Sequence, residues 1–144
     1  MKYQYFDSVQ ITPHFNSAEF RCKCGNEHEF EVNDELVKKL EKLYAALNCS
    51  KIIVTSGYRC ARLNRALKGS SPTSSHLIGF AADLVPSNGD IAGFKRFAVK
   101  WLKENNIKFD QCLCETNGKG KQWVHLGLYN QRHQQRKQIL NLQV

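Results

Sequence analysis

The sequence predicts an α+β domain in which a small, mostly antiparallel sheet is flanked by helices. Two stretches carry apolar residues at helical spacing, and several shorter stretches rich in β-branched residues are bounded by turn residues. A third observation is the Asn-Gly and glycine-rich segment 116–122, which is typical of a hairpin turn between two strands. At 144 residues, the chain has the length of one domain with a substantial core.

The first long helix is predicted to begin after Asn33, a residue type that caps helices, and to continue to Asn48. Its apolar residues recur at helical spacing and indicate one buried face, formed by Leu36, Val37, Leu40, Leu43, Tyr44 and Leu47. A second long helix is predicted over residues 90–105 and a short one over 60–67. We interpret the apolar stripes as core and not as cofactor-binding surfaces.

Strands are predicted over residues 51–55, 80–85, 110–115 and 122–129. No internal repeat or low-complexity stretch divides the chain, so we expect a single domain, 1–144, with its core at about 15–128. The tail 130–144 is basic and glutamine-rich, with Ile139 and Leu140 as its main apolar residues. We expect this tail to form a short helix packed on the domain.

Three residues suited to zinc occur in two short motifs, Ser-x-His-x-x-Gly-x-Ala-x-Asp and Trp-x-His. The first motif contains His76 and Asp83, and the second contains His125. Catalytic zinc takes three protein ligands and leaves a fourth position for water. Asp83 lies in a predicted buried strand, where a cation would remove the cost of burying a carboxylate. The alternative is that the three residues are structural: a loop cap, a lysine-paired aspartate and a core histidine.

A further motif, Thr55-Ser56-Gly57-Tyr58-Arg59, follows the apolar run 52–54 and indicates a strand that enters a turn. An arginine just past a strand end can present a fixed, two-pronged donor to a carboxylate. Together with the two histidine motifs, Arg59 therefore predicts a metal site that binds an acidic ligand.

These motifs, with Glu19-Phe20-Arg21-Cys22, Asn64 and Phe109-Asp110-Gln111, resemble the zinc D-alanyl-D-alanine carboxypeptidase family. That family includes phage endolysin peptidases and shares its fold with the hedgehog signalling domain, and the resemblance runs from about Phe15 to about Leu128. It implies that His76, Asp83 and His125 bind one zinc ion and that Arg59 holds the carboxylate of the substrate. The implied reaction is hydrolysis of the peptidoglycan stem peptide, at D-Ala-D-Ala or at an L-Ala-to-D-Glu link.

The general base has two candidate positions in this family. Many relatives place an acidic residue three positions before the last histidine ligand, but this chain has Gln122 there, and an amide is no base. Other members carry a glutamate at the end of the preceding strand, which is Glu115 here. A hairpin would bring Glu115 and His125 to one metal site, so we expect Glu115 to be the base, with Asp110 as the fallback.

Besides Arg59, three further residues are expected at the substrate pocket. Ser75 would add a hydrogen bond to the substrate or to a metal ligand, and Tyr58 and Trp123 would form pocket walls. A turn serine and two ordinary packing aromatics are the alternatives. A non-catalytic, zinc-bearing binding module of the same fold also remains open as a function.

The formal net charge of +8 attracts anionic partners, such as nucleic acid or the anionic polymers of the bacterial cell wall. Arg132, Arg136 and Lys137 could form a nucleic-acid patch, which a salt-sensitive DNA interaction would reveal. The chain has no recognised nucleic-acid motif, however, so we expect no nucleic-acid partner. Nothing in the pattern suggests heptads, and a monomer is expected.

The sequence begins without the apolar segment of a signal peptide and contains no transmembrane run. We expect synthesis in the cytoplasm and action on the cell wall, for example after release during phage lysis. Six cysteines are then expected to be free thiols, with a disulfide possible outside the cell. Because alternate strand residues face one side, Cys22-x-Cys24 or Cys112-x-Cys114 could instead hold a second, structural metal.

Overall fold

The computed structural model describes residues 1–144, and its central element is a five-stranded sheet in the order β5-β6-β8-β7-β9. All neighbouring strands in this sheet are antiparallel except β7 and β9, which are parallel. The strands are β5 (Ile52–Ser56), β6 (Ala81–Pro86), β7 (Gln111–Thr116), β8 (Gln122–Gly127) and β9 (Gln138–Gln143). The predicted α+β class with a mostly antiparallel sheet is confirmed.

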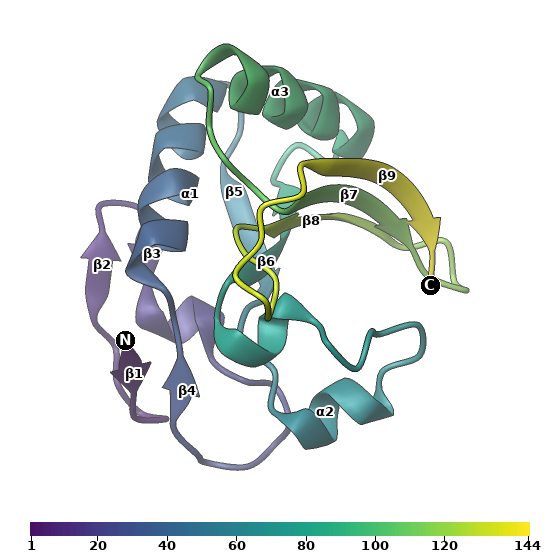
Figure 1. The fold of residues 1–144 in the computed structure, drawn as a ribbon. Coiled ribbons are helices and arrows are strands. Elements are labelled where there is room, and N and C mark those ends of the chain that lie inside the picture. The colour runs from purple at the N-terminus through teal and green to yellow at the C-terminus, as the bar shows by residue number, and fades with distance from the viewer.

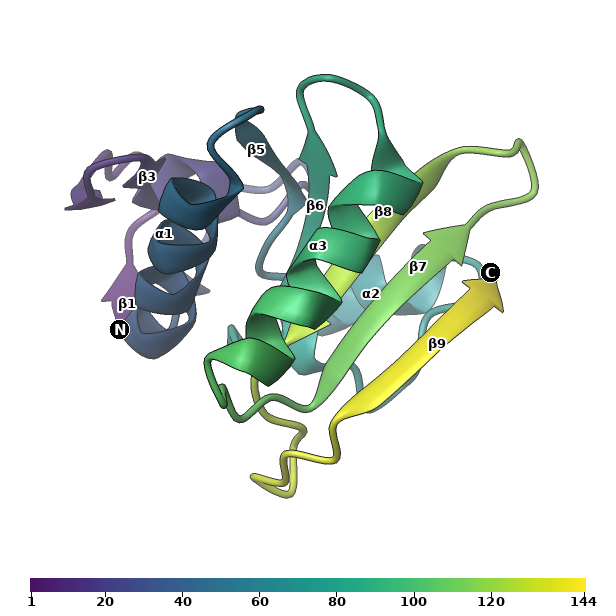
Figure 2. The same cartoon turned by 90° about the horizontal axis from the view of Figure 1, so that it is seen from above.

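Helices cover the two faces of the sheet unequally (Figures 1 and 2). The long helices α1 (Asp34–Leu47) and α3 (Ile91–Glu104) lie on one face, and the short α2 (Ala61–Ala66) lies on the other. None of these helices combines the length and hydrophobicity needed to cross a membrane. Because only the short α2 covers the other face, part of that face stays open, and a site can form there.

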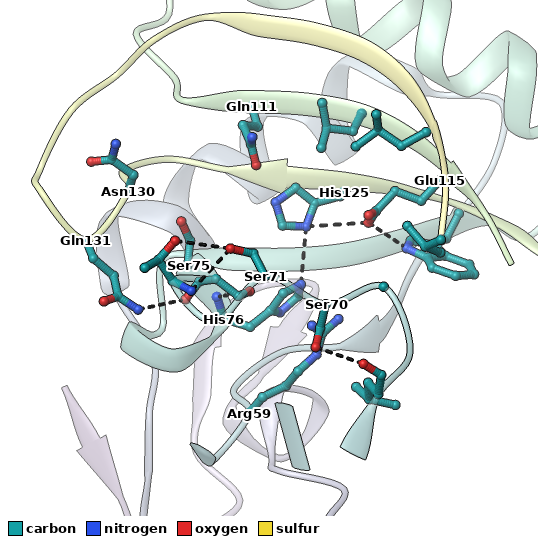
Figure 3. A pocket seen from close by; sticks show the side chains of 18 of the residues that line it. Arg59, Ser70, Ser71, Ser75, His76, Gln111, Glu115, His125, Asn130 and Gln131 are labelled. Atoms are coloured by element: carbon teal, nitrogen blue, oxygen red, sulfur yellow. Dashed lines mark hydrogen bonds and ion pairs between the residues drawn. The ribbon is translucent and has the colours of Figure 1, made fainter. Parts of the chain in front are cut away.

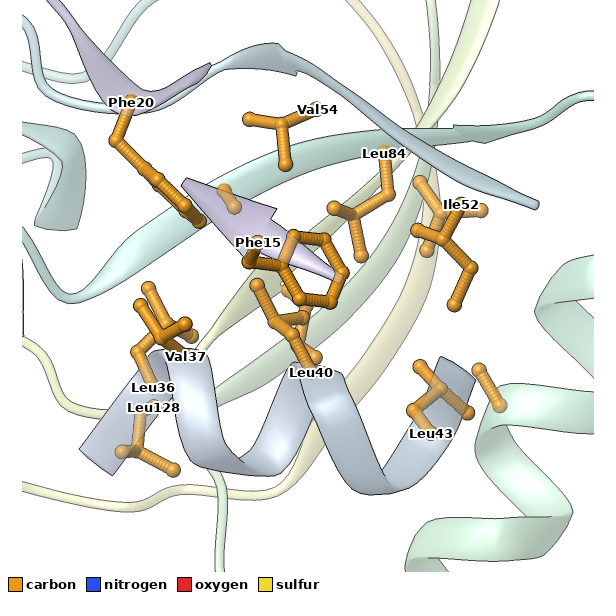
Figure 4. Packing of buried hydrophobic residues seen from close by; sticks show 14 of the residues in the cluster. Phe15, Phe20, Leu36, Val37, Leu40, Leu43, Ile52, Val54, Leu84 and Leu128 are labelled. Carbon is orange, nitrogen blue, oxygen red and sulfur yellow. The ribbon is translucent and has the colours of Figure 1, made fainter. Parts of the chain in front are cut away.

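The core lies between α1, α3 and the sheet, where α1 turns its apolar stripe toward buried strand residues such as Val54 and Leu84 (Figure 4). The start of α1 is fixed by Asn33, whose Oδ1 accepts a hydrogen bond from the Leu36 backbone N–H at 3.2 Å. This side chain satisfies a backbone donor that the helix itself leaves free. The predicted cap and the buried face of this helix are thus confirmed.

The N-terminal segment forms small elements beside α1 that the hydrophobic pattern did not reveal. They are β1 (Lys2–Tyr3), β2 (Gln10–Thr12), β3 (Phe15–Asn16), the 3-10 helix η1 (Ser17–Phe20) and β4 (Phe30–Glu31). Two-residue strands are too short to show an alternating pattern. The segment is nevertheless anchored, because Phe15 and Phe20 are buried in the core.

The tail corrects one expectation. Residues 138–143 form the edge strand β9 and not a helix, with Ile139 paired to Cys112 and Leu140 paired to Leu113. Leu140 remains 47% exposed, so it does not anchor the tail by burial. An edge strand is held by backbone hydrogen bonds to its neighbour, which do not depend on side-chain hydrophobicity.

Candidate metal centre

Strand pairing brings the sequence-predicted residues to one face of the sheet. Asp83 on β6 is directly opposite His125 on β8, and Glu115 on β7 is directly opposite Trp123 on β8. Successive strand residues point to opposite faces. The neighbours Ala82, Leu84, Val124 and Leu126 therefore enter the helix-covered core, while the polar residues face the other side.

Three ligand atoms converge where β6 and β8 pass the 3-10 helix η2 (Ser75–Ile78). His76 Nε2 lies 3.1 Å from Asp83 Oδ1, and His125 Nδ1 lies 3.1 Å from the same oxygen. The two histidine nitrogens are 3.2 Å apart (Figure 3). All three side chains are buried.

His76 is oriented as a metal ligand by a backbone partner. Its Nδ1 donates a hydrogen bond to the Gly57 carbonyl at 2.6 Å, so Nε2 is the ring nitrogen that faces Asp83. Its position also depends on Gly79, which ends η2 with φ +73. A side chain at Gly79 would meet the Glu31 carbonyl oxygen at 2.6 Å.

Asp83 is a buried carboxylate surrounded by nitrogen atoms. Burial raises the pKa of Asp83, but His76 and His125 outweigh that effect and hold the pKa far below its usual range. Arg59 Nη2 donates to Asp83 Oδ2 at 2.9 Å, so the two carboxylate oxygens have different partners. Burial lowers the pKa of His125, and the Asp83 carboxylate more than reverses this effect. The cluster is thus built around a fixed negative charge.

The cluster fits a zinc ion. Tetrahedral zinc with bonds near 2.0–2.1 Å places its nitrogen and oxygen ligands about 3.3 Å apart, which matches the separations of 3.1, 3.1 and 3.2 Å observed here. Two neutral imidazoles and one carboxylate also form a donor set typical of catalytic zinc, with one position left for water.

Glu115 lies next to this cluster on the cavity side. Its Oε1 is 3.8 Å from His125 Nδ1 and accepts a hydrogen bond from Trp123 Nε1 at 3.0 Å. Gln122 is exposed and donates to Thr116 Oγ1 on β7, on the strand face away from His125. Asp110 is 1% exposed, and Arg136 binds both of its oxygens. Of the acidic candidates, only Glu115 faces the cluster.

The family model for peptidase M15 matches residues 13–126. The chain belongs to the peptidase M15 family. This family consists of zinc-dependent metallopeptidases that act on peptidoglycan peptides, and the sequence-based family assignment is confirmed. A comparison with curated proteins gives no match.

The M15 domain has a cavity of about 890 Å³ beside the ligand atoms, into which both histidines open (Figure 3). Its walls come from β7, β8, β9 and the segments 67–76 and 130–136. The charged residues in its lining are one anion, Glu115, and four cations: Arg59, Lys68, Arg132 and Arg136. Because Arg59 and Arg136 are paired with carboxylates, Lys68 and Arg132 are the cations left to attract an anionic ligand.

The structure separates the three residues that we expected at the substrate pocket. Ser75 and Trp123 line the cavity. Tyr58 lines a different hollow, together with Phe30 and Leu77, and its ring packs edge-on against His28. Tyr58 is thus a packing residue away from the cavity, contrary to its expected place in the wall.

Sequence reasoning missed the backbone partner of His76. The Gly57 carbonyl orients the His76 ring, but a backbone oxygen can belong to any residue type and has no sequence signature. The available signal was the strand-to-turn motif Ser-Gly-Tyr-Arg, which contains Gly57. It also did not foresee that Arg59 contacts Asp83 and Ser56 within the protein. The basic patch proposed for nucleic acid is not free either, since Arg136 is paired with Asp110.

Proposed function

We propose that this M15 peptidase hydrolyses the peptidoglycan stem peptide, at D-Ala-D-Ala or at an L-Ala-to-D-Glu link, with one catalytic zinc at His76, Asp83 and His125. The observation that carries the proposal is the Glu115 carboxylate, 3.8 Å from a ligand nitrogen and open to the cavity. A purely structural zinc site would need no acid at that position. Zinc bound there would polarise the scissile carbonyl and lower the pKa of a coordinated water.

Glu115 is proposed as the general base. Its carboxylate would take the proton of the attacking water and deliver it to the leaving amine. The Trp123 indole N–H holds Oε1 at 3.0 Å, which restricts the carboxylate to the side of His125. Such a fixed position supports proton transfer better than a mobile side chain would.

Arg59 is proposed to bind the carboxylate of the substrate while it also holds Asp83. Its Nη2 is engaged by Asp83 at 2.9 Å, but Nη1 has only a 3.5 Å contact, to Asn64 Oδ1. The exposed cations Lys68 and Arg132 lie elsewhere in the cavity lining and would attract the other acidic groups of a stem peptide. Ser75 and Trp123 would contact the peptide directly.

The alternative function is a zinc-bearing binding module without catalysis. It shares the ligand set but does not use Glu115 as a base, so the two functions separate at this residue. Glu115→Gln keeps the size and the hydrogen-bond acceptor but loses the proton acceptor. We expect this variant to retain zinc and to lose about 10²–10⁴-fold in turnover, the range that general bases contribute.

The experiment measures release of amino groups from purified peptidoglycan by wild-type protein, before chelation, after chelation and after zinc is restored. Gln122→Ala is the matched control, because Gln122 faces away from the cluster and should keep full activity. Zinc binding with cleavage unchanged in Glu115→Gln would refute the assigned base. Zinc binding without cleavage of walls of several chemotypes would favour the binding module.

A further inference from the structure

A second group of metal-binding side chains lies outside the catalytic site. Its members belong to the loop between η1 and β4 and to the residue that precedes α2, and their ligand atoms all lie within 4.8 Å of one another: Cys22, Cys24, His28 and Cys60. The other cysteines do not join it. Cys112 is buried in the core, Cys49 is exposed, and Cys114 lies on β7.

We infer that the protein carries a second zinc site, with a structural role, formed by Cys22, Cys24, His28 and Cys60. Three thiolates and one imidazole complete a tetrahedral shell, so this site is closed and leaves no position for water or substrate. Such a shell places its ligand atoms about 3.5–3.8 Å apart. The 4.8 Å spread of the group therefore requires only small side-chain adjustments around the ion.

The histidine of this group is already oriented as a ligand. His28 Nδ1 donates to the Glu29 carbonyl oxygen at 2.7 Å, so Nε2 is the ring nitrogen that faces the group, 3.1 Å from Cys24 Sγ. A carbonyl partner on the far ring nitrogen is the usual support of a metal-binding histidine. The same arrangement orients His76 in the catalytic site through Gly57.

Backbone N–H groups point at two of the sulfurs. The Cys60 N–H donates to Cys22 Sγ at 3.3 Å, and the Leu63 N–H donates to Cys60 Sγ at 3.5 Å. Hydrogen bonds of this kind stabilise sulfur as the thiolate that binds zinc. A disulfide is a poorer explanation of the cluster, because three thiols cannot all pair within it and the histidine would have no role.

The loop itself supports a metal, because it has almost no hydrophobic anchor. None of residues 23–29 is buried, and Gly25 turns the chain at φ +87 with open space around it. A segment of this kind is rarely ordered by packing alone, and a metal can supply the missing free energy. Zinc would join this loop to Cys60, the residue after Arg59.

The first experiment measures metal per chain in full-length protein purified under reducing conditions from zinc-supplemented medium. We expect two zinc ions in the wild type, one in Cys24→Ser and one in His76→Ala. Cys114→Ser is the matched control and should keep two, since Cys114 lies outside both groups. Cobalt substitution gives an independent readout, because only thiolate ligands produce sulfur-to-cobalt charge-transfer absorption.

This design distinguishes loss of metal at the second site from loss of metal at the catalytic site. The charge-transfer band should persist in His76→Ala, whose catalytic site is disrupted, and should be strongly reduced in Cys24→Ser. Zinc added to metal-free His76→Ala should also protect the exposed Lys23 from trypsin. The inference would be overturned if cobalt-substituted wild type lacked the band, or if wild type and Cys24→Ser each held one zinc. The wild-type spectrum does not depend on whether any variant folds.

Discussion

At the scale of single residues, the chemistry depends on which atom each side chain presents. Glu115 and Trp123 face each other across β7 and β8, and the resulting hydrogen bond of 3.0 Å directs the carboxylate to the cluster. Such a bond fixes the orientation of the acid. Trp123 is thus a positioning residue for the proposed base as well as a wall of the cavity.

Trp123→Phe should keep the aromatic wall and remove the donor to Glu115. A hydrogen bond to a charged group contributes about 1.5 kcal/mol, so we expect turnover to fall about tenfold. The carboxylate would lose the donor that holds it beside His125, so the loss should fall on kcat and not on KM. Zinc content should not change.

The measurement is kcat and KM for peptidoglycan cleavage by the two proteins at equal zinc content. A rise in KM with kcat unchanged would show that Trp123 acts only by contact with the substrate. A loss of zinc would show that the substitution disturbs His125, which lies two residues further along β8.

The residue types of the site were predictable, but several of their partners were not. The motifs of His76, Asp83 and His125 predicted a ligand set because few other functions need those types together, and the structure brings the three side chains together. The sequence did not reveal that Arg59 binds Asp83, since a contact between residues 24 positions apart depends on how β5 and β6 pair. Nor did it single out Cys22-x-Cys24 over Cys112-x-Cys114, because the two patterns are alike.

At the scale of elements, the turn after β5 connects the core to the metal site. Gly57 packs so closely on η1 that an added Cβ would lie 2.5 Å from Phe20 Cα. The following residue, Tyr58, donates its backbone N–H to the Phe20 carbonyl at 2.9 Å. Because the Gly57 carbonyl also orients His76, any shift of this turn moves a proposed metal ligand.

Gly57→Ala should therefore weaken zinc binding at the catalytic site as well as stability. We expect a loss of about 1–3 kcal/mol in the free energy of unfolding, as for other overpacked positions. Loss of the backbone partner of His76 should lower zinc affinity about 10–100-fold. Competition with a chelator measures the affinity, and chemical denaturation measures stability.

Gly118→Ala is the control for this substitution. Gly118 lies in the hairpin between β7 and β8, where an added Cβ would meet nothing within 4 Å. The stability and the zinc affinity of the Gly118→Ala variant should stay close to those of the wild type. Equal zinc affinity in Gly57→Ala and wild type would show that the turn does not control the position of His76.

The helices and the strands of the hairpin were predictable because each has one buried face, which produces a period in the sequence. The edge strand β9 gave a weaker signal. Leu140 and Leu142 alternate with polar residues, but both are exposed, so hydrophobic burial does not specify the strand. β9 pairs with β7 because the chain returns to that edge of the sheet after β8. No local sequence pattern encodes this return.

At the scale of the whole molecule, one ion pair joins the tail to the rest of the sheet. Arg136 Nε and Nη2 bind the two oxygens of Asp110 at 2.8 and 2.9 Å, just before β9 begins. Beyond this pair, Leu142 of β9 and the following Val144 line one rim of the cavity. Gly69 lies on the opposite rim, so close that an added Cβ there would be 2.7 Å from Val144 Cβ. The shape of the cavity thus depends on how firmly the tail is attached.

Arg136→Ala should destabilise the protein, because it leaves the buried Asp110 carboxylate without a counter-charge. Breaking a fully buried pair costs about 3–5 kcal/mol. The Arg136 side chain is 41% exposed, however, so water can reach the carboxylate in the variant. We therefore expect a smaller loss, about 2–3 kcal/mol in the free energy of unfolding. Arg132→Ala, which breaks no ion pair in the structure, should change stability by less than about 0.5 kcal/mol.

The double variant Asp110→Asn, Arg136→Ala tests the cause of the effect. The amide oxygen can still accept the Arg136 backbone N–H that now binds Asp110 Oδ1 at 3.1 Å, and no unpaired charge remains. Part of the lost stability should therefore return in chemical denaturation, and hydrogen exchange should show β9 protected again. If the double variant is less stable than Arg136→Ala alone, the guanidinium stabilises the tail by packing and not by its charge.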